Sequence, residues 1–137
     1  MVTHTQIQTS TDDTKPDFSA SYTPGPMMLF RYSALTFNSH LIHYDYKYAT
    51  EVESYPDLIV HGPLTCTLLL DLLVKNLPVS QQSRIKSFSY RAVSPLIMRR
   101  TLSVNGRMGV DHNPNLVELW AKNDHGGLAM KGTAEIA

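Results

Sequence analysis

The fold of this chain is decided by the run GPLTCTLLLDLLVKN, which occupies residues 62–76. Its leucines and valine cover most of the circumference of a helix, so the helix must be buried on nearly all sides. Pro63 fits the first helical turn, where a missing N–H leaves nothing unsatisfied, and Pro78 ends the helix. Because the run is too short to cross a bilayer, other parts of the protein must enclose it.

Four strand-like runs follow this helix and can enclose it. They occupy about 84–93, 96–105, 115–122 and 127–136. In the last run, apolar side chains fall at alternating positions, at Leu128, Met130, Ala134 and Ile136. This period of two is typical of an antiparallel sheet with one face directed inward. We expect Asn105-Gly106 to break the second run and residues 123–127 to form a hairpin turn.

A sheet that curls around one long apolar helix has the α+β arrangement called the hot-dog fold. A chain of 137 residues fits one domain, and we assign residues 25–137 to it. Residues 1–24 are polar and rich in turn formers, so we expect a flexible arm, either disordered or lying across a partner. A single open sheet leaves an edge strand unpaired, which predicts a homodimer joined at the edges.

Shorter elements are predicted ahead of the main helix. Residues 27–37 are mostly apolar and fit a short helix or a strand, of which we favour the helix. Residues 38–44 are expected to form a loop, and Asp45 is placed to cap a short helix over residues 46–52. Residues 58–60 fit a brief extended segment.

The composition argues against several classes of protein. Twelve basic residues balance twelve acidic ones, so the net charge gives no reason to expect nucleic-acid binding. No apolar run approaches the roughly 20 residues of a membrane span, and the N-terminus has neither a signal-peptide nor a transit-peptide pattern. The single cysteine, Cys66, cannot form an internal disulfide, which fits a reducing compartment. We expect a cytoplasmic protein, with mitochondrial and peroxisomal locations left open.

Three motifs contain the residues suited to chemistry. They read FNSHLIHYD at residues 37–45, YPDLIVHGPL at residues 55–64 and YRAVSPL at residues 90–96. In this order they resemble the MaoC-like acyl-thioester dehydratases and hydratases, and most closely the branch of mesaconyl-CoA hydratase and mitochondrial 3-hydroxyacyl-thioester dehydratase. The resemblance covers roughly residues 27–136. It implies a hot-dog fold and the reversible addition or loss of water at the α,β-position of an acyl thioester.

The resemblance also implies residue roles. In that superfamily an Asp and a His, spaced like Asn38 and His43 here, handle the water and the proton. The His position matches His43, and the Asp position matches Asn38. The second amide position matches His40, and the proline position matches Leu41, where the close branch carries Arg. Members of that branch often contain a second hot-dog unit, and this chain resembles the catalytic unit.

Dehydration of a 3-hydroxyacyl thioester needs a group that removes a proton beside the carbonyl and one that protonates the leaving hydroxyl. An imidazole suits both tasks, so His43 is the first candidate for acid or base. Asn38 cannot take a proton, but it can hold a water or a hydroxyl, and His40 can assist. The alternative for His43 and Asn38 is that they only hydrogen-bond the loop, and the alternative for His40 is a structural or surface role. Asp45 fits a helix cap better than a catalytic role.

Gly62 stands at the start of the main helix. Its backbone N–H and the helix dipole can stabilise the enolate oxygen, and the missing side chain permits close approach; the alternative is a plain helix-start glycine. His61 either lines the site or lies buried in a hydrogen bond. His40 and His43 are too few ligands for zinc, so neither a metal nor another cofactor is expected.

Charge is unevenly distributed along the chain. Residues 72–110 contain no Asp or Glu but carry cationic side chains at Lys75, Arg84, Lys86, Arg91, Arg99, Arg100 and Arg107. This region is either a solvated sheet face or a surface for an anionic ligand. In the second case Arg91 and Arg99, with Arg100, are candidates to bind the phosphates of coenzyme A or an acidic carrier protein.

The sequence therefore predicts a hydro-lyase that acts on an acyl thioester of coenzyme A or of a carrier protein, or on a related activated carbonyl compound. Two alternatives stay open. One is a biosynthetic enzyme on the same scaffold that dehydrates or cyclises a polyketide-like intermediate. The other is a non-catalytic hot-dog subunit that binds a ligand or pairs with an active partner.

Overall fold

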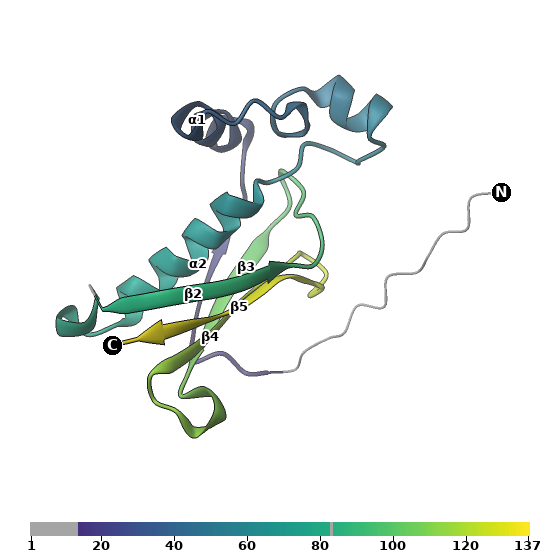
Figure 1. The fold of residues 1–137 in the computed structure, drawn as a ribbon. Coiled ribbons are helices and arrows are strands. Elements are labelled where there is room, and N and C mark those ends of the chain that lie inside the picture. Colours follow the sequence, from purple (N-terminus) through teal and green to yellow (C-terminus); the bar gives the residue numbers. More distant parts are fainter. Residues whose placement is uncertain (1–13, 83) are drawn as a thin grey trace.

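The protein, a computed structural model that describes residues 14–82 and 84–137, consists of one long helix packed against one sheet (Figure 1). Helix α2, Gly62–Asn76, has the bounds predicted for it. The antiparallel sheet has the strand order β1-β3-β4-β5-β2. Its strands are β1 Phe18–Tyr22, β2 Ile85–Ala92, β3 Leu102–Met108, β4 Leu116–Lys122 and β5 Leu128–Ile136. The predicted α+β arrangement is therefore confirmed.

The hydrophobic core lies between α2 and the inner face of the sheet. The helix contributes Leu64, Leu68, Leu69, Leu72 and Leu73, and the sheet contributes Val104, Val117, Leu119, Ala121, Met130 and Ala134. Leu69 and Leu73 are fully buried. Burial of one such side chain stabilises the fold by about 2 kcal/mol, so this row of leucines fixes where the amino end of α2 lies.

The second predicted strand has different bounds from those expected. Residues 96–98 pair with residues 58–60 instead of joining the sheet: Val60 N–H donates to the Leu96 carbonyl at 2.9 Å, and Met98 N–H donates to the Leu58 carbonyl at 2.9 Å. Arg99 then adopts a left-handed conformation, with φ of 62°, which ends the extended segment. Strand β3 begins only at Leu102.

The prediction that Asn105-Gly106 breaks a strand is wrong, because both residues lie inside β3. Gly106 pairs with Phe18 of β1, and a Cβ atom at Gly106 would lie 2.1 Å from Cε2 of the Phe18 ring. The glycine therefore makes room for an aromatic ring and does not form a turn. The turn predicted at residues 123–127 is confirmed, since Asn123 N–H donates to the Gly127 carbonyl at 2.8 Å.

The sequence predicted a flexible arm over residues 1–24. This prediction is wrong for residues 18–22, which form strand β1 at one edge of the sheet. Phe18, Ala20 and Tyr22 alternate with serines and pack against the core, a period of two that is typical of a half-buried strand. Residues 1–13 lie outside the described residues. The domain therefore begins before residue 25.

A group of short helices lies beyond the amino end of α2 (Figure 1). It comprises α1 Pro26–Thr36, the 3₁₀ turn η1 Leu41–His43 and the π-helical turn η2 Tyr48–Val52. Two further 3₁₀ turns, η3 Val79–Gln81 and η4 Val110–His112, follow α2 and β3. The predicted helix over residues 27–37 and the Asp45 cap are confirmed, since the Asp45 carboxylate accepts a hydrogen bond from Tyr48 N–H at 3.0 Å. Within the described residues, no helix combines the length and apolar character needed to cross a membrane.

Candidate active site

His43 is held in one orientation by the backbone. Its Nδ1 lies 2.7 Å from the carbonyl oxygen of Ile59, and Ile59 N–H in turn donates to the Ile42 carbonyl at 2.9 Å. Because a carbonyl only accepts hydrogen bonds, Nδ1 carries the proton in the neutral ring and Nε2 has the free lone pair. Burial lowers the pKa of His43 from its usual value, and the nearby His40 lowers this pKa further, against the opposing effect of the Ile59 hydrogen bond. The ring is therefore a neutral imidazole at neutral pH, and Nε2 can accept a proton.

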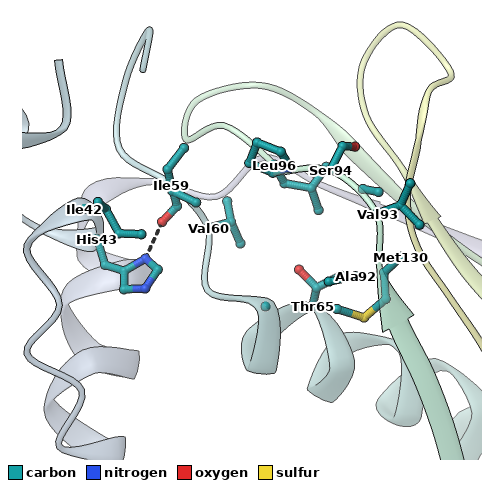
Figure 2. Close-up of a pocket in the computed structure, with 13 residues that line it drawn as sticks. Ile42, His43, Ile59, Val60, Thr65, Ala92, Val93, Ser94, Leu96 and Met130 are labelled. Carbon is teal, nitrogen blue, oxygen red and sulfur yellow. Dashed lines mark hydrogen bonds between the residues drawn. The ribbon is translucent and has the colours of Figure 1, made fainter. Parts of the chain in front are cut away.

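A cavity of about 340 Å³, called here the first cavity, opens beside His43. Figure 2 shows His43 and Ile59 on one side of it and Ala92, Val93 and Met130 on the other. The lining residues are Ile42, His43, Ile59, Val60, Gly62, Thr65, Ala92, Val93, Ser94, Pro95, Leu96, Ala129 and Met130. A mainly apolar cavity with a few fixed polar groups is typical of a small-molecule site.

Gly62 lines the same cavity and is the first residue of α2. The first turn of a helix has N–H groups without helical partners and the positive end of the helix dipole. No acidic residue stands in this first turn, and no described side chain caps it. A Cβ atom at Gly62 would meet no other atom within 4 Å, so the helix start is open to a ligand. The structure therefore brings an imidazole and a helix amino end to one cavity.

His61 does not line the first cavity. Its side chain is fully buried, and its ring stacks on that of His43, with 3.7 Å between the centroids and 17° between the planes. Its Nε2 lies 2.7 Å from the hydroxyl oxygen of Ser33 in α1. Of the two alternatives from the sequence, the structure shows the buried, hydrogen-bonded histidine. Burial, and next the proximity of His43, lower the pKa of His61 to about 4.

Asn38 lies on a different cavity. This second cavity, of about 330 Å³, is lined by Phe30, Ser33, Ala34, Phe37, Asn38, Ser39 and Tyr44. The Asn38 carboxamide oxygen accepts a hydrogen bond from His40 N–H at 3.1 Å, so it organises the loop locally. The His40 ring is exposed and meets the His43 ring edge-on at 5.8 Å between centroids.

The two candidate arginines are exposed, and they differ in their contacts. Arg99 pairs with Asp57, with 2.8 Å between Nη1 and Oδ2. Arg91 precedes Ala92 in β2, and Ala92 lines the first cavity. Three other cationic side chains of residues 72–110 form ion pairs with acidic residues from outside that region. These pairs are Lys75–Asp71, Lys86–Glu135 and Arg107–Glu118. The uneven charge of the sequence is therefore partly neutralised in the fold.

The sequence did not identify several groups that shape this site. Ser33 lies 28 residues from His61, and the Ile59 group that holds His43 is a backbone carbonyl, so neither could be found from spacing. Thr65 could have been found, because a residue three positions after Gly62 falls on the same face of a helix. Among the described residues, no group of three His, Cys, Asp or Glu side chains could hold a metal ion.

Comparisons with known proteins identify the family. A family model described as hydroxyacyl-thioester dehydratase type 2 matches residues 2–98. Mesaconyl-C(4)-CoA hydratase of Chloroflexus aurantiacus is 39% identical over 113 residues, which are 82% of this chain and 38% of that protein. Mitochondrial hydroxyacyl-thioester dehydratase type 2 of Schizosaccharomyces pombe is 40% identical over 89 residues, which are 65% of this chain and 29% of that protein.

A solved structure agrees with these matches at the level of the fold. The MaoC-like dehydratase from Phytophthora capsici superposes with a TM-score of 0.77 at 20% identity, over 91% of this chain and 41% of that chain. This likeness confirms the hot-dog fold. The chain thus spans well under half the length of the two curated relatives. It belongs to the hydroxyacyl-thioester dehydratase type 2 family.

Proposed function

We propose that this chain catalyses the reversible addition or removal of water at the α,β-position of an acyl thioester. Membership of the hydroxyacyl-thioester dehydratase type 2 family supports this activity. The observation that carries the proposal is the shared lining of the first cavity: a fixed, buried imidazole, His43, and the open amino end of α2 at Gly62. These are the two features that proton abstraction beside a thioester carbonyl requires.

In the dehydration direction, Nε2 of His43 removes a proton from Cα of a 3-hydroxyacyl thioester. The electron pair left on Cα is delocalised onto the thioester oxygen, where the amino end of α2 stabilises the negative charge. The C–O bond at Cβ then breaks, and the imidazolium returns its proton to the leaving hydroxyl. The products are an enoyl thioester and water, and His43 is regenerated in its neutral form.

Asn38 and His40 are proposed to hold the departing hydroxyl. The Asn38 amide cannot take a proton, and the Asp45 carboxylate is engaged by Tyr48 N–H, so His43 is proposed to perform both transfers. His40 is within reach of this role, because its ring lies beside that of His43. For Asn38 the role requires its amide nitrogen to reach the reacting hydroxyl while its oxygen remains bonded to the His40 backbone.

The thioester carrier is proposed to bind on the arginine side of the cavity mouth. Arg91 is the stronger candidate, because it forms no ion pair with another described residue, whereas the Arg99 guanidinium already pairs with Asp57. His61 is proposed to support this site from behind His43 and not by touching substrate. The proton transfers proposed above use only groups of this chain, and no cofactor is proposed.

The direct test is hydration of short and medium trans-2-enoyl-CoA thioesters, followed by loss of the enoyl-thioester absorbance. We expect turnover with at least one chain length. Turnover restricted to a carrier-protein thioester or to a larger polyketide-like intermediate would support the proposed reaction class but identify a different substrate. If purified protein, alone and with a related hot-dog subunit, hydrates none of these compounds, the proposal fails.

A homodimer joined through β2 is proposed as the working assembly. Strand β2 pairs with β5 on one side only among the described residues, and Tyr90 on it is 48% exposed beside Phe88, with 5.5 Å between the ring centroids. An exposed aromatic edge strand is suited to pairing with a second copy. We expect twice the 15.4 kDa chain mass in light scattering, and a shift to monomer in Tyr90→Lys.

One observation favours a second candidate function, a non-catalytic subunit. Asn38 cannot take a proton and lines a different cavity from His43, so a second hot-dog unit would supply the second proton carrier. A stable heterodimer with such a unit, together with no turnover by this chain alone, would favour that function. The cytoplasm remains our proposed compartment, to be tested by microscopy of the tagged protein.

A further inference from the structure

His61 occupies the junction of the three parts that make up the candidate site. It directly precedes Gly62 and is the N-cap residue of α2. Its ring stacks on His43, meets the ring of Tyr32 edge-on at 4.9 Å between centroids, and bonds to the Ser33 hydroxyl at 2.7 Å. One fully buried side chain therefore connects α1, the amino end of α2 and the proposed base.

We propose that His61 is a positioning residue, which holds the His43 ring at a fixed place relative to the Gly62 amide. The inference rests on the proposed function, because it concerns the same reaction. Among the described residues the His43 ring has one hydrogen bond, from Nδ1 to the Ile59 carbonyl, and a single bond allows the ring to rock about that contact. The stacked His61 ring covers one face of the imidazole and removes this freedom.

The geometry excludes a role for His61 in proton relay to His43. Rings stacked at 3.7 Å with 17° between their planes direct their nitrogens sideways and not at each other. The Nε2 of His61 is engaged by Ser33, and its Nδ1 has no hydrogen-bond partner among the described residues. A buried nitrogen without a hydrogen-bond partner destabilises the fold, so a preference for the best hydrogen bonding does not explain the position of this ring.

The stack works only if His61 is neutral, and its surroundings ensure this. The titratable side chains that face the two rings are Tyr32 from α1 and His40 from the loop, and no carboxylate contacts either ring among the described residues. Two stacked imidazolium rings would repel each other at short range. Burial, followed by the nearby His43, holds the pKa of His61 at about 4, so His61 stays neutral in mildly acidic solution.

The test combines imidazole ¹⁵N NMR with kinetics on the full chain. His61→Gln keeps a polar side chain near Ser33 but removes the ring, whereas Ser33→Ala keeps the ring and removes its hydrogen bond. His125→Gln is the matched control, because His125 lies in the β4–β5 turn with 80% of its side chain exposed. The substrate is the enoyl-CoA on which the wild type shows turnover.

We expect wild-type His43 to show one tautomer, with the proton on Nδ1. In His61→Gln we expect a mixed or exchange-broadened signal and a titration midpoint raised toward the ordinary value, because water reaches the uncovered face. The value of kcat should fall roughly 10- to 100-fold, with KM changed less than about threefold, since displacement of a catalytic group by 1 Å has this order of effect. Ser33→Ala should show a smaller change of the same kind, and His125→Gln none.

An unchanged His43 tautomer, midpoint and kcat in folded His61→Gln would overturn the proposal. If His61→Gln does not fold, the same three unchanged readings in Ser33→Ala would overturn it. If the wild type has no thioester turnover, the proposed function fails, and the NMR readings alone decide whether His61 positions His43.

Discussion

The first cavity, at the amino end of α2, and the second cavity, beside α1, have almost the same volume, about 340 and 330 Å³, and differ in the groups that line them. The first contains an imidazole bonded to a backbone carbonyl and the open end of a long helix. The second is bordered by Phe30 and by Phe37, which is 95% exposed, and its polar groups come from Ser33 of α1 and from the loop that follows α1. Volume alone therefore does not mark a site, whereas fixed polar groups do.

The partition between the cavities explains this difference. Ser33 lines the second cavity and bonds to His61, and His61 stacks on His43, which lines the first. Ser33, His61 and His43 thus separate the two cavities: the Ser33 residue lines the second cavity, and His43, the proposed proton acceptor, lines the first. Asn38 and His43, five residues apart in one motif, therefore face different spaces in the free protein.

The largest effect is expected from His43→Ala, which removes the proposed proton carrier of the first cavity. We expect kcat for enoyl-CoA hydration to fall by roughly 10²- to 10⁴-fold, the usual contribution of general acid–base catalysis. The variant should retain its fold, because His43 is not part of the cluster of buried apolar side chains. A coupled absorbance assay with circular dichroism of the same sample measures both quantities.

The control for that variant is His112→Ala, an exposed histidine in η4 far along the chain, which should keep wild-type turnover. If His43→Ala hydrates the thioester as fast as the wild type, the first cavity is not the reaction site. The second cavity, or a partner's site, would then become the candidate.

The fold could be predicted from the sequence because its main signals are local. The apolar run at residues 62–76 and the period of two at residues 128–136 each specify one element without knowledge of the rest. The error at Asn105-Gly106 had a non-local cause. Gly106 resembled a turn because the ring of Phe18, 88 positions earlier in the chain, could not be placed beside it from sequence.

The candidate site could be predicted less completely. The motif spacing indicated His43 and Gly62, which line one cavity, but did not indicate that His61 lies behind the base or that Asn38 lines another cavity. These placements depend on how α1 and the loop after it pack on the start of α2. Such packing depends on contacts between distant segments, and a single sequence does not contain them as a pattern.

The second prediction concerns the buried stack that separates the cavities. His43 and His61 both have lowered pKa values in the fold, His61 about 4, so the unfolded chain binds more protons than the folded one below about pH 6.5. The free energy of unfolding should therefore be constant above that pH and fall between about pH 6.5 and 4. His61 alone should account for up to about 3 kcal/mol of the loss.

Urea unfolding at a series of pH values measures this dependence. Carboxylates also titrate toward the lower end of the range, so the informative quantity is the difference between the wild type and His61→Gln, which lacks the buried titrating group. A difference that does not change between pH 4 and 7 would show that His61 is not protected from protonation.

The third prediction concerns the helix start in the first cavity. Gly62→Ala should fold at least as well as the wild type, because a Cβ atom there meets no atom within 4 Å and φ is not left-handed. We expect a stability gain of about 0.5 kcal/mol. Turnover should fall by roughly tenfold, which is about 1.4 kcal/mol in the barrier, because the new methyl group occupies space beside the helix amide.

Opposite signs for stability and activity would separate a ligand-facing glycine from a plain helix-start glycine. Thermal unfolding gives the first quantity and kcat/KM the second. Gly25→Ala is the matched control, because Gly25 also stands at a helix start, a Cβ atom there would meet no atom within 4 Å, and it lies outside both cavity linings. Unchanged turnover in Gly62→Ala would contradict approach of the thioester to this helix start.

The smallest effect is expected at the second cavity, from Asn38→Ala compared with Ser39→Ala. Both residues line that cavity, but only Asn38 has a side-chain hydrogen bond to the loop, at 3.1 Å to His40 N–H. Loss of one hydrogen bond to the reacting hydroxyl costs about 1 kcal/mol, so kcat should fall about fivefold in Asn38→Ala. Ser39→Ala should retain wild-type kcat, since the Tyr44 hydroxyl bonds to its backbone carbonyl and not to its side chain.

Asn38→Asp distinguishes the two contributions of Asn38. The carboxylate can still accept the His40 N–H, so the loop is retained, while the amide donor toward the hydroxyl is lost. If Asn38→Asp keeps wild-type turnover while Asn38→Ala does not, the amide donor is not required, and either the bond to His40 N–H or a carboxylate at the family's Asp position is sufficient. If both variants lose turnover equally, the amide group itself reaches the substrate, and the second cavity joins the first when the thioester binds.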